Sequence, residues 1–230
     1  MAIDWSAVKV VKIPEGDCKR VAINGTIVWE KGGLPSEYQQ VEYIESTGTQ
    51  YITTDYTPTI TENMKIEIDY MFTRIQDEDS FLFGSRLNSS NIPTFQCEYY
   101  SNKWWYCGSG IWQFRNIFRG IGGDLNTRYS LVMDKNVIAI NNFTNASTET
   151  RQNGKAVPIY IFAGNWYGQT QYINKGARIY CLTFTADGVK EAEFVPCYRK
   201  SDGEIGMYDL VNGVFYTNSG SGTFIKGEDV

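Results

Sequence analysis

Two acidic residues at alternate positions are the first residues of this chain that could do chemistry. Glu67 and Asp69 stand two apart in a segment of alternating apolar residues. Retaining glycosidases need two carboxyl groups about 5–5.5 Å apart, and alternate positions of a strand share one face. Some glycosidases align a third acid as E-x-D-x-E or E-x-D-x-x-E, but here Met71 and Phe72 occupy its two places. We therefore expect Glu67 and Asp69 to form a solvated face with Lys65, and a glycoside hydrolase is a remote alternative.

The absence of histidine from the 230 residues limits the chemistry further. Ser-His-Asp and Cys-His nucleophiles and metal sites that need imidazole are excluded. The five cysteines contain no C-x-x-C pair, which a zinc knuckle or a redox dithiol would require. We expect reduced, buried thiols, although two of them could face each other across a hairpin. The cysteines are Cys18, Cys97, Cys107, Cys181 and Cys197, and the facing pair would be Cys97 and Cys107.

Calcium is the one metal for which the chain offers dense oxygen ligands. Asp77-Glu78-Asp79 and Asp202-Gly203-Glu204 are the two acidic clusters. Acidic loop tips of this kind are usually only solvated, so we expect no metal site, no cofactor and no catalytic residue. The chain is predicted not to be an enzyme.

Aromatic residues are in excess, at 15% of the chain, with 16 Tyr, 12 Phe and 6 Trp. Sugar rings stack on aromatic planes, and Tyr and Trp dominate protein-contact surfaces. Adjacent residues of a strand point to opposite faces, so one of Trp104 and Trp105 is expected in the core and the other at the surface. The alternative for any single ring is that it fills the core. The predicted ligand-binding residues are Trp104, Trp105, Tyr106, Trp112, Trp166 and Tyr167.

The elements that must position these side chains are predicted to be strands throughout. Met64–Phe72 alternates with period two, and no segment shows a sustained helical period. Ala177–Thr185 is apolar on both faces, as expected for a central strand covered on both sides. Short strands separated by turns indicate an all-β, antiparallel β-sandwich. The other predicted strands are Ser80–Leu87, Thr94–Tyr100, Arg128–Asp134, Val137–Asn141, Ile159–Phe162 and Val189–Tyr198.

The first 33 residues are predicted to form a separate β-hairpin. Two strand-like runs, Lys19–Ile23 and Thr26–Lys31, flank Asn24-Gly25, the pair that a type I′ turn prefers. A segment this short cannot bury a core alone, so it must lie on something else. We expect residues 1–33 to be a docking segment and residues 34–230 to be the sandwich, the alternative being an extra edge hairpin of that sandwich. The predicted attachment residues are Val21, Ile23, Ile27 and Trp29.

The net charge of −5 and the pI of about 4.9 argue against nucleic acid and anionic membrane as partners, because both need a basic surface. No apolar run approaches about 18 residues, so no membrane-spanning helix is expected. The first residues have no basic region followed by an apolar one, so we predict no secretory signal. Synthesis in a cytoplasm is therefore expected.

The two ends of the predicted sandwich carry a family resemblance. LPSEYQQVEYIESTGTQYI spans Leu34–Ile52, and GEIGMYDLVNGVFYTNSGSGTF spans Gly203–Phe224. Both are short alternating strands broken by Gly, Asn and Ser turns. The pair is similar to the opening and closing segments of the concanavalin A-like (laminin-G-like) jelly-roll modules in phage and prophage structural proteins of gut Firmicutes.

The resemblance implies a jelly-roll fold and a place in a virion. It implies a non-enzymatic accessory protein of a tail fibre, a baseplate or a head decoration, with a lectin-like domain for host-surface or environmental glycans. Other virion proteins would bind the N-terminal segment, and the chain would form a homo-oligomer, for example a trimer. The alternative is a purely structural decoration protein without a ligand.

Overall fold

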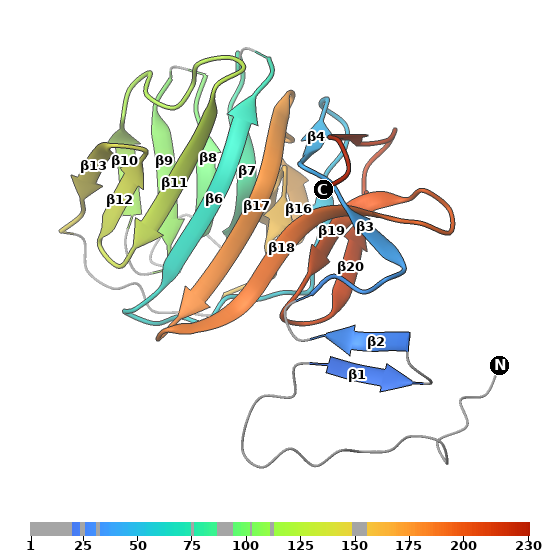
Figure 1. Ribbon diagram of the computed structural model, residues 1–230. Helices are drawn as coiled ribbons and strands as arrows, with labels where there is room; N and C mark the ends of the chain where they lie inside the picture. Colours follow the sequence, from blue (N-terminus) through green and yellow to red (C-terminus); the bar gives the residue numbers. More distant parts are fainter. Residues whose placement is uncertain are drawn as a thin grey trace.

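The computed structural model describes residues 20–23, 26–30, 33–74, 76–86, 94–101, 103–110, 113–148 and 156–230. All of the regular structure in these ranges is β-strand, and two antiparallel sheets pack face to face as a β-sandwich (Figure 1). The predicted fold class is thereby confirmed. The described part of the chain holds no helix of the length and apolarity that a membrane crossing requires.

The larger sheet forms the front layer in Figure 1. The long strands β6, β17 and β18 lie at its centre. Of the shorter strands, β3 pairs with β18, β4 pairs with β17, and β21 pairs with β4. Its main order is β13 (Phe143–Ala146), β12 (Val137–Ile140), β11 (Arg128–Asp134), β6 (Lys65–Phe72), β17 (Ala177–Ala186), β18 (Val189–Arg199), β19 (Ile205–Asp209) and β20 (Val214–Thr217), with β3 (Tyr38–Gln40), β4 (Ile44–Ser46) and β21 (Ile225–Lys226) beside it.

The smaller sheet lies behind the larger one (Figure 1). Strand β7 is its centre, because it pairs with β8, with β14 and, in parallel, with β15. The main order is β10 (Gln113–Ile117), β9 (Trp105–Ser109), β8 (Phe95–Tyr99), β7 (Ser80–Arg86), β14 (Tyr160–Ile161) and β5 (Ile52–Thr53), with the hairpin of β15 (Gly164–Trp166) and β16 (Gln169–Gln171) attached to β7.

The predicted strands agree with the observed ones to within a few residues at each end. The period-two alternation of β6 is real: Ile66, Ile68 and Tyr70 are fully buried, and the residues between them are half-buried. The expectation for Ala177–Thr185 was wrong in one respect. Its strand β17 is central but is covered by a sheet on one face only, and Tyr180 and Thr183 on its other face are half-buried.

The core lies between the two sheets and is rich in aromatic rings. Phe72 and Tyr70 of β6 contact Trp105 of β9 across the layers, with ring centroids 6.1 and 5.5 Å apart. Trp105 also donates its indole N–H to the Ile121 carbonyl oxygen at 2.9 Å, which satisfies its polar atom inside the core. Cys97 and Cys107 face each other from β8 and β9 as free thiols, with sulfur atoms 3.7 Å apart.

The N-terminal strands β1 (Arg20–Ile23) and β2 (Thr26–Glu30) pair antiparallel in a two-stranded sheet of their own. This confirms the predicted hairpin, and Val21 pairs with Trp29 in its register. Asn24-Gly25 lies outside the described residues. Whether Val21, Ile23, Ile27 and Trp29 attach the chain to a partner remains a prediction, as does the boundary between residues 33 and 34.

Candidate functional site

One row of residues crosses the outer face of the smaller sheet, the face turned away from the core. In β8, Phe95, Cys97 and Tyr99 belong to the core, so Glu98 between them points outward. Strand pairing places Phe81 of β7 and Tyr106 of β9 directly opposite Glu98, and the row continues from Tyr106 to its partner in β10. That partner is Arg115.

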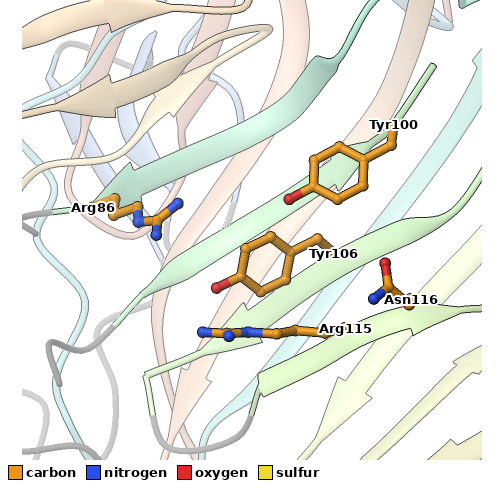
Figure 2. Close-up of a pocket in the computed structure, with 5 residues that line it drawn as sticks. All are labelled: Arg86, Tyr100, Tyr106, Arg115 and Asn116. Atoms are coloured by element: carbon orange, nitrogen blue, oxygen red, sulfur yellow. The ribbon is translucent and has the colours of Figure 1, made fainter. Parts of the chain in front are cut away.

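A cleft of about 300 Å³ opens along this row. We call it the outer cleft, and the described residues that line it are Arg86, Tyr100, Tyr106, Arg115 and Asn116. Figure 2 shows the side chains of Tyr100, Tyr106 and Arg115 extending toward the space that the Arg86 guanidinium group faces from the end of β7. Two guanidinium groups and two phenol rings therefore surround one space.

Aromatic rings hold both arginines in place. The guanidinium carbons of Arg86 and Arg115 lie 5.9 and 5.1 Å from the centre of the Tyr106 ring. The Arg86 carbon also lies 4.7 Å from the centre of the Trp166 ring, which extends the site to β15. Such cation–π contacts contribute roughly 0.5–2 kcal/mol each and restrict the side chain to one place. The cationic groups of the outer cleft are therefore positioned before any ligand binds.

Irregular backbone positions the other two lining residues. The register of β10 shifts between Arg115 and Ile117, and Asn116 at this bulge has a φ of 53°. Asparagine tolerates this left-handed conformation better than most residues. Tyr100 closes the turn between β8 and β9 by accepting a hydrogen bond from the Lys103 amide and donating one to the Trp104 carbonyl, both of 2.8 Å. Its ring lies 6.1 Å from that of Tyr106.

A buried polar pair lies in the sheet beside the outer cleft. Gln96 is fully buried and Glu98 is 3% exposed. The Gln96 side-chain amide donates to Glu98 Oε2 at 3.1 Å, and Gln96 Oε1 has no hydrogen-bond partner within the described part of the chain. Burial, and then the charge of Asp79, raise the pKa of Glu98 to about 8, against weaker opposing effects of Arg86 and Gln96. The Glu98 carboxyl is therefore mostly protonated and neutral at pH 7.

The predicted ligand-binding residues that the structure describes lie in different surroundings. Tyr106 lines the outer cleft, and Trp166 reaches it through Arg86. Tyr167 is 53% exposed and donates its backbone N–H to the Arg86 carbonyl, so it lies beside the site. Trp104 is half-buried and is not part of the cleft lining, and the guanidinium carbon of Arg119 lies 5.7 Å from the centre of its ring. The remaining two are Trp105 and Trp112.

Trp105 must be removed from the ligand-binding set, because it is fully buried in the core. The expectation that one of Trp104 and Trp105 lies in the core is confirmed, and Trp105 is that residue. Trp112 lies outside the described residues, so its role stays a prediction.

Sequence reasoning missed four of the five residues that line the outer cleft: Arg86, Tyr100, Arg115 and Asn116. Two of the strands did carry a signal. In β8, Gln96 and Glu98 alternate with core residues, so their polar side chains lie on the face of the strand that is turned away from the core. Arg115 follows the core residue Phe114 in the same way. Only the strand order brings these positions together.

The acids of the broken triplet lie elsewhere, on the outward face of the larger sheet. Glu67 pairs with Lys65 at 2.7 Å, and Asp69 pairs with Arg128 at 2.7 Å. These ion pairs support the interpretation of a solvated face. Of the acidic loops, Asp79 accepts hydrogen bonds from the Ser101 amide and hydroxyl, and Asp202 pairs with Arg199 at 2.7 Å.

A second cleft, of about 320 Å³, lies near Asp55, Tyr56 and Tyr216. Its polar groups are engaged with protein partners: Tyr56 donates to Glu191 at 2.9 Å, and Tyr216 donates to Asp55. No basic residue is among the described residues that line it. Its described lining lacks the pair of guanidinium groups that the outer cleft has, so this cleft is the weaker candidate for a ligand.

Comparisons with known proteins assign no function to the chain, so the proposal of a function depends on the geometry of the site. No protein-family model matches the chain, and no curated protein is significantly similar to it in sequence.

Proposed function

We propose that the chain is a non-enzymatic glycan-binding protein that binds sugars in the outer cleft. The observation that carries this proposal is the convergence of two phenol rings and two guanidinium groups around one space on the outer face of a β-sheet (Figure 2). Aromatic planes stack on sugar C–H faces, while fixed polar groups bind hydroxyls and set the orientation. The tryptophan at the Arg86 end, Trp166, adds a third ring to this surface.

The setting that we propose for this activity is a phage or prophage virion. The support is the resemblance of Leu34–Ile52 and Gly203–Phe224 to the ends of concanavalin A-like jelly-roll modules, together with a sandwich of two antiparallel sheets. The protein would be an accessory component of a tail fibre, a baseplate or a head decoration. Residues 1–33 would bind other virion proteins, and a homo-oligomer, for example a trimer, would display several clefts. Neither nucleic acid nor membrane is a proposed partner.

A glycan array tests the binding activity. The purified full-length chain is applied to an array of bacterial-surface and environmental polysaccharides, beside Tyr100→Ala and the control Phe143→Ala. Tyr100 lines the outer cleft, whereas Phe143 is an exposed aromatic residue on β13 at the far edge of the other sheet. We expect binding that Tyr100→Ala weakens and Phe143→Ala leaves intact. Silence of the folded wild type across the array would favour the purely structural alternative.

The virion setting has a separate test. Particles purified from the bacterial host that carries this sequence are expected to contain the protein, as measured by mass spectrometry of intact, nuclease-treated particles. Its absence from particles that contain the other structural proteins would overturn the virion proposal and leave the glycan-binding proposal untouched.

A further inference from the structure

Two free thiols face each other in the smaller sheet, on its core side. Cys97 of β8 and Cys107 of β9 are directly opposite in the strand register, and both are fully buried. Their sulfur atoms lie 3.7 Å apart, which is close to van der Waals contact. Directly opposite residues of antiparallel strands have Cα atoms about 4.5–5.5 Å apart, and disulfide bonds span about 4.4–6.8 Å. The backbone therefore already has the spacing that a disulfide bond needs.

The strand pairing around the two cysteines is regular. It runs from the pair of Phe95 and Ser109 to the pair of Tyr99 and Trp105, and the two cysteines form its middle pair. Because they already share a register position, joining the sulfurs requires rotation of two side chains but no shift of either strand. Core packing does not oppose the bond, since a cysteine side chain packs as a small apolar group.

The position of the pair connects it to the outer cleft. Nine residues separate the two cysteines, and they include Tyr100 and Tyr106, which line the cleft (Figure 2). Next to the cysteine pair, Glu98 and Tyr106 form the adjacent register pair, on the opposite face of the sheet. A bond between the sulfurs would close a ring of chain that contains both tyrosines.

We propose that Cys97 and Cys107 form a disulfide bond in an oxidising environment, and that this bond stabilises the β8–β9 hairpin that carries Tyr100 and Tyr106. The cysteine pair is thus a modification site on the core side of the sheet whose outer side holds the cleft. The proposal is independent of what the cleft binds, because it depends on the facing thiols alone.

The step is a thiol–disulfide exchange, with oxidised glutathione or another small disulfide as the oxidant. One cysteine thiolate attacks a sulfur of the oxidant, forms a mixed disulfide and releases one thiol. The second cysteine thiolate attacks the protein sulfur of the mixed disulfide, which forms the new bond and releases the other thiol. The cysteine pair loses two protons and two electrons, and the oxidant takes up both to become two thiols.

Burial determines when this exchange occurs. Both sulfurs are fully buried, and burial raises the pKa of the Cys97 thiol, so the folded chain offers little reactive thiolate. Exchange therefore requires the hairpin to be open, as it is during folding. A reducing cytoplasm keeps thiols reduced, whereas disulfides persist outside the cell. The bond is expected in chains that fold or open under oxidising conditions.

The test refolds the reduced, full-length protein from urea, either with oxidised glutathione or with an excess of reduced glutathione. Free thiols are then blocked with iodoacetamide, and the chain is digested with trypsin without reduction. Cleavage after Lys103 separates the two cysteines, so peptides 87–103 and 104–115 stay together only if a disulfide joins them. We expect mass spectrometry to find the two peptides joined in the oxidised sample. In the reduced sample they should be separate and alkylated.

Thermal unfolding measures the effect of the bond on stability. The oxidised wild type should unfold at a temperature about 5–10 °C above that of the reduced wild type, as expected for a closed loop of this length. In the double variant Cys97→Ala/Cys107→Ala this difference should disappear. The matched control is Cys197→Ala, which removes another fully buried thiol, in β18 of the larger sheet, and should keep the difference. Each comparison is made within one protein, so cavity effects cancel.

The outcomes decide the proposal without involving the glycan array. Alkylation of both Cys97 and Cys107 after refolding in oxidised glutathione would overturn it, as would a link from either of them to a different cysteine. Equal unfolding temperatures of the linked and the reduced wild type would also overturn it. The peptide result and the temperature difference are both measured on the wild type, so they stand even if the double variant does not fold.

Discussion

The guanidinium carbon of Arg86 lies 4.7 Å from the centre of the Trp166 ring, although 79 intervening residues separate the two in the sequence. The parallel pairing of β15 with β7 creates this contact, because it places Trp166 directly beside Arg86. The same guanidinium group lies over Tyr106. Arg86 therefore connects the tryptophan of one hairpin to the tyrosine of another, and the outer cleft depends on all three.

Replacing Trp166 with alanine tests this connection. The variant loses both a ring surface for the sugar and the support of Arg86, so we expect glycan affinity to fall at least about 10-fold, or about 1.4 kcal/mol. Trp166 is half-buried, so the fold should survive. Calorimetric titration measures the affinity, with Phe143→Ala as the control. An unchanged affinity of a folded Trp166→Ala variant would show that Trp166 lies outside the site.

Replacing the adjacent residues Trp104 and Trp105 with alanine, one at a time, should give very different losses in the free energy of unfolding. Trp105 is fully buried among Tyr70, Phe72 and Tyr99, so Trp105→Ala should lower the free energy of unfolding by about 3–5 kcal/mol. Trp104 is half-buried, and Trp104→Ala should cost about 1 kcal/mol or less. Urea unfolding followed by circular dichroism measures both. Similar losses in the two variants would contradict the assignment of Trp105 to the core.

Most of the strands and their buried faces could be predicted from the sequence, because both depend on the local pattern of residues. Alternation in Lys65–Phe72 and Arg128–Asp134 fixes both the strand and its buried face, since period two belongs to the strand itself. The assembly of the outer cleft is not local. Arg86 and Arg115 come together only through the order β7–β8–β9–β10, which no single strand encodes. The order and packing of the strands were also needed to decide which of Trp104 and Trp105 is buried. Alternation shows that the two side chains lie on opposite faces, but it does not show which face is the core.

The pKa of Glu98 predicts a dependence of stability on pH. Burial raises this pKa from its ordinary value of 4.5 to about 8, so the folded chain binds more protons than the unfolded chain between these values. The contribution of Glu98 to stability is complete below about pH 4.5 and is lost as pH rises toward 8. The free energy of unfolding of the wild type, relative to Glu98→Gln, should therefore fall across this window.

Glu98→Gln is the control because it has the shape of the protonated acid and cannot ionise. Urea unfolding of both proteins at a series of pH values gives the difference directly. We expect the variant to be the more stable protein above pH 8. Parallel curves from pH 4.5 to 9 would mean that Glu98 titrates normally and is accessible to water.

Deletion of residues 1–33 tests the predicted boundary. The described core extends from Val41 to Phe224 and lies wholly within residues 34–230. The shortened chain is expected to unfold cooperatively at a temperature close to that of the full chain, and to lose incorporation into particles. Calorimetry measures the first and mass spectrometry of particles the second. A deletion variant that cannot fold would place the hairpin in the sandwich instead.

Nuclear magnetic resonance titration tests the glycan-binding claim most directly, since it locates the ligand. The isotope-labelled protein is titrated with the oligosaccharide that gives the strongest array signal. The account predicts shifts in the amides of Tyr100, Tyr106 and Asn116, in the Arg86 and Arg115 side chains and in the Trp166 indole N–H. Shifts confined to the second cleft at Asp55, Tyr56 and Tyr216, with the outer cleft unchanged, would contradict it.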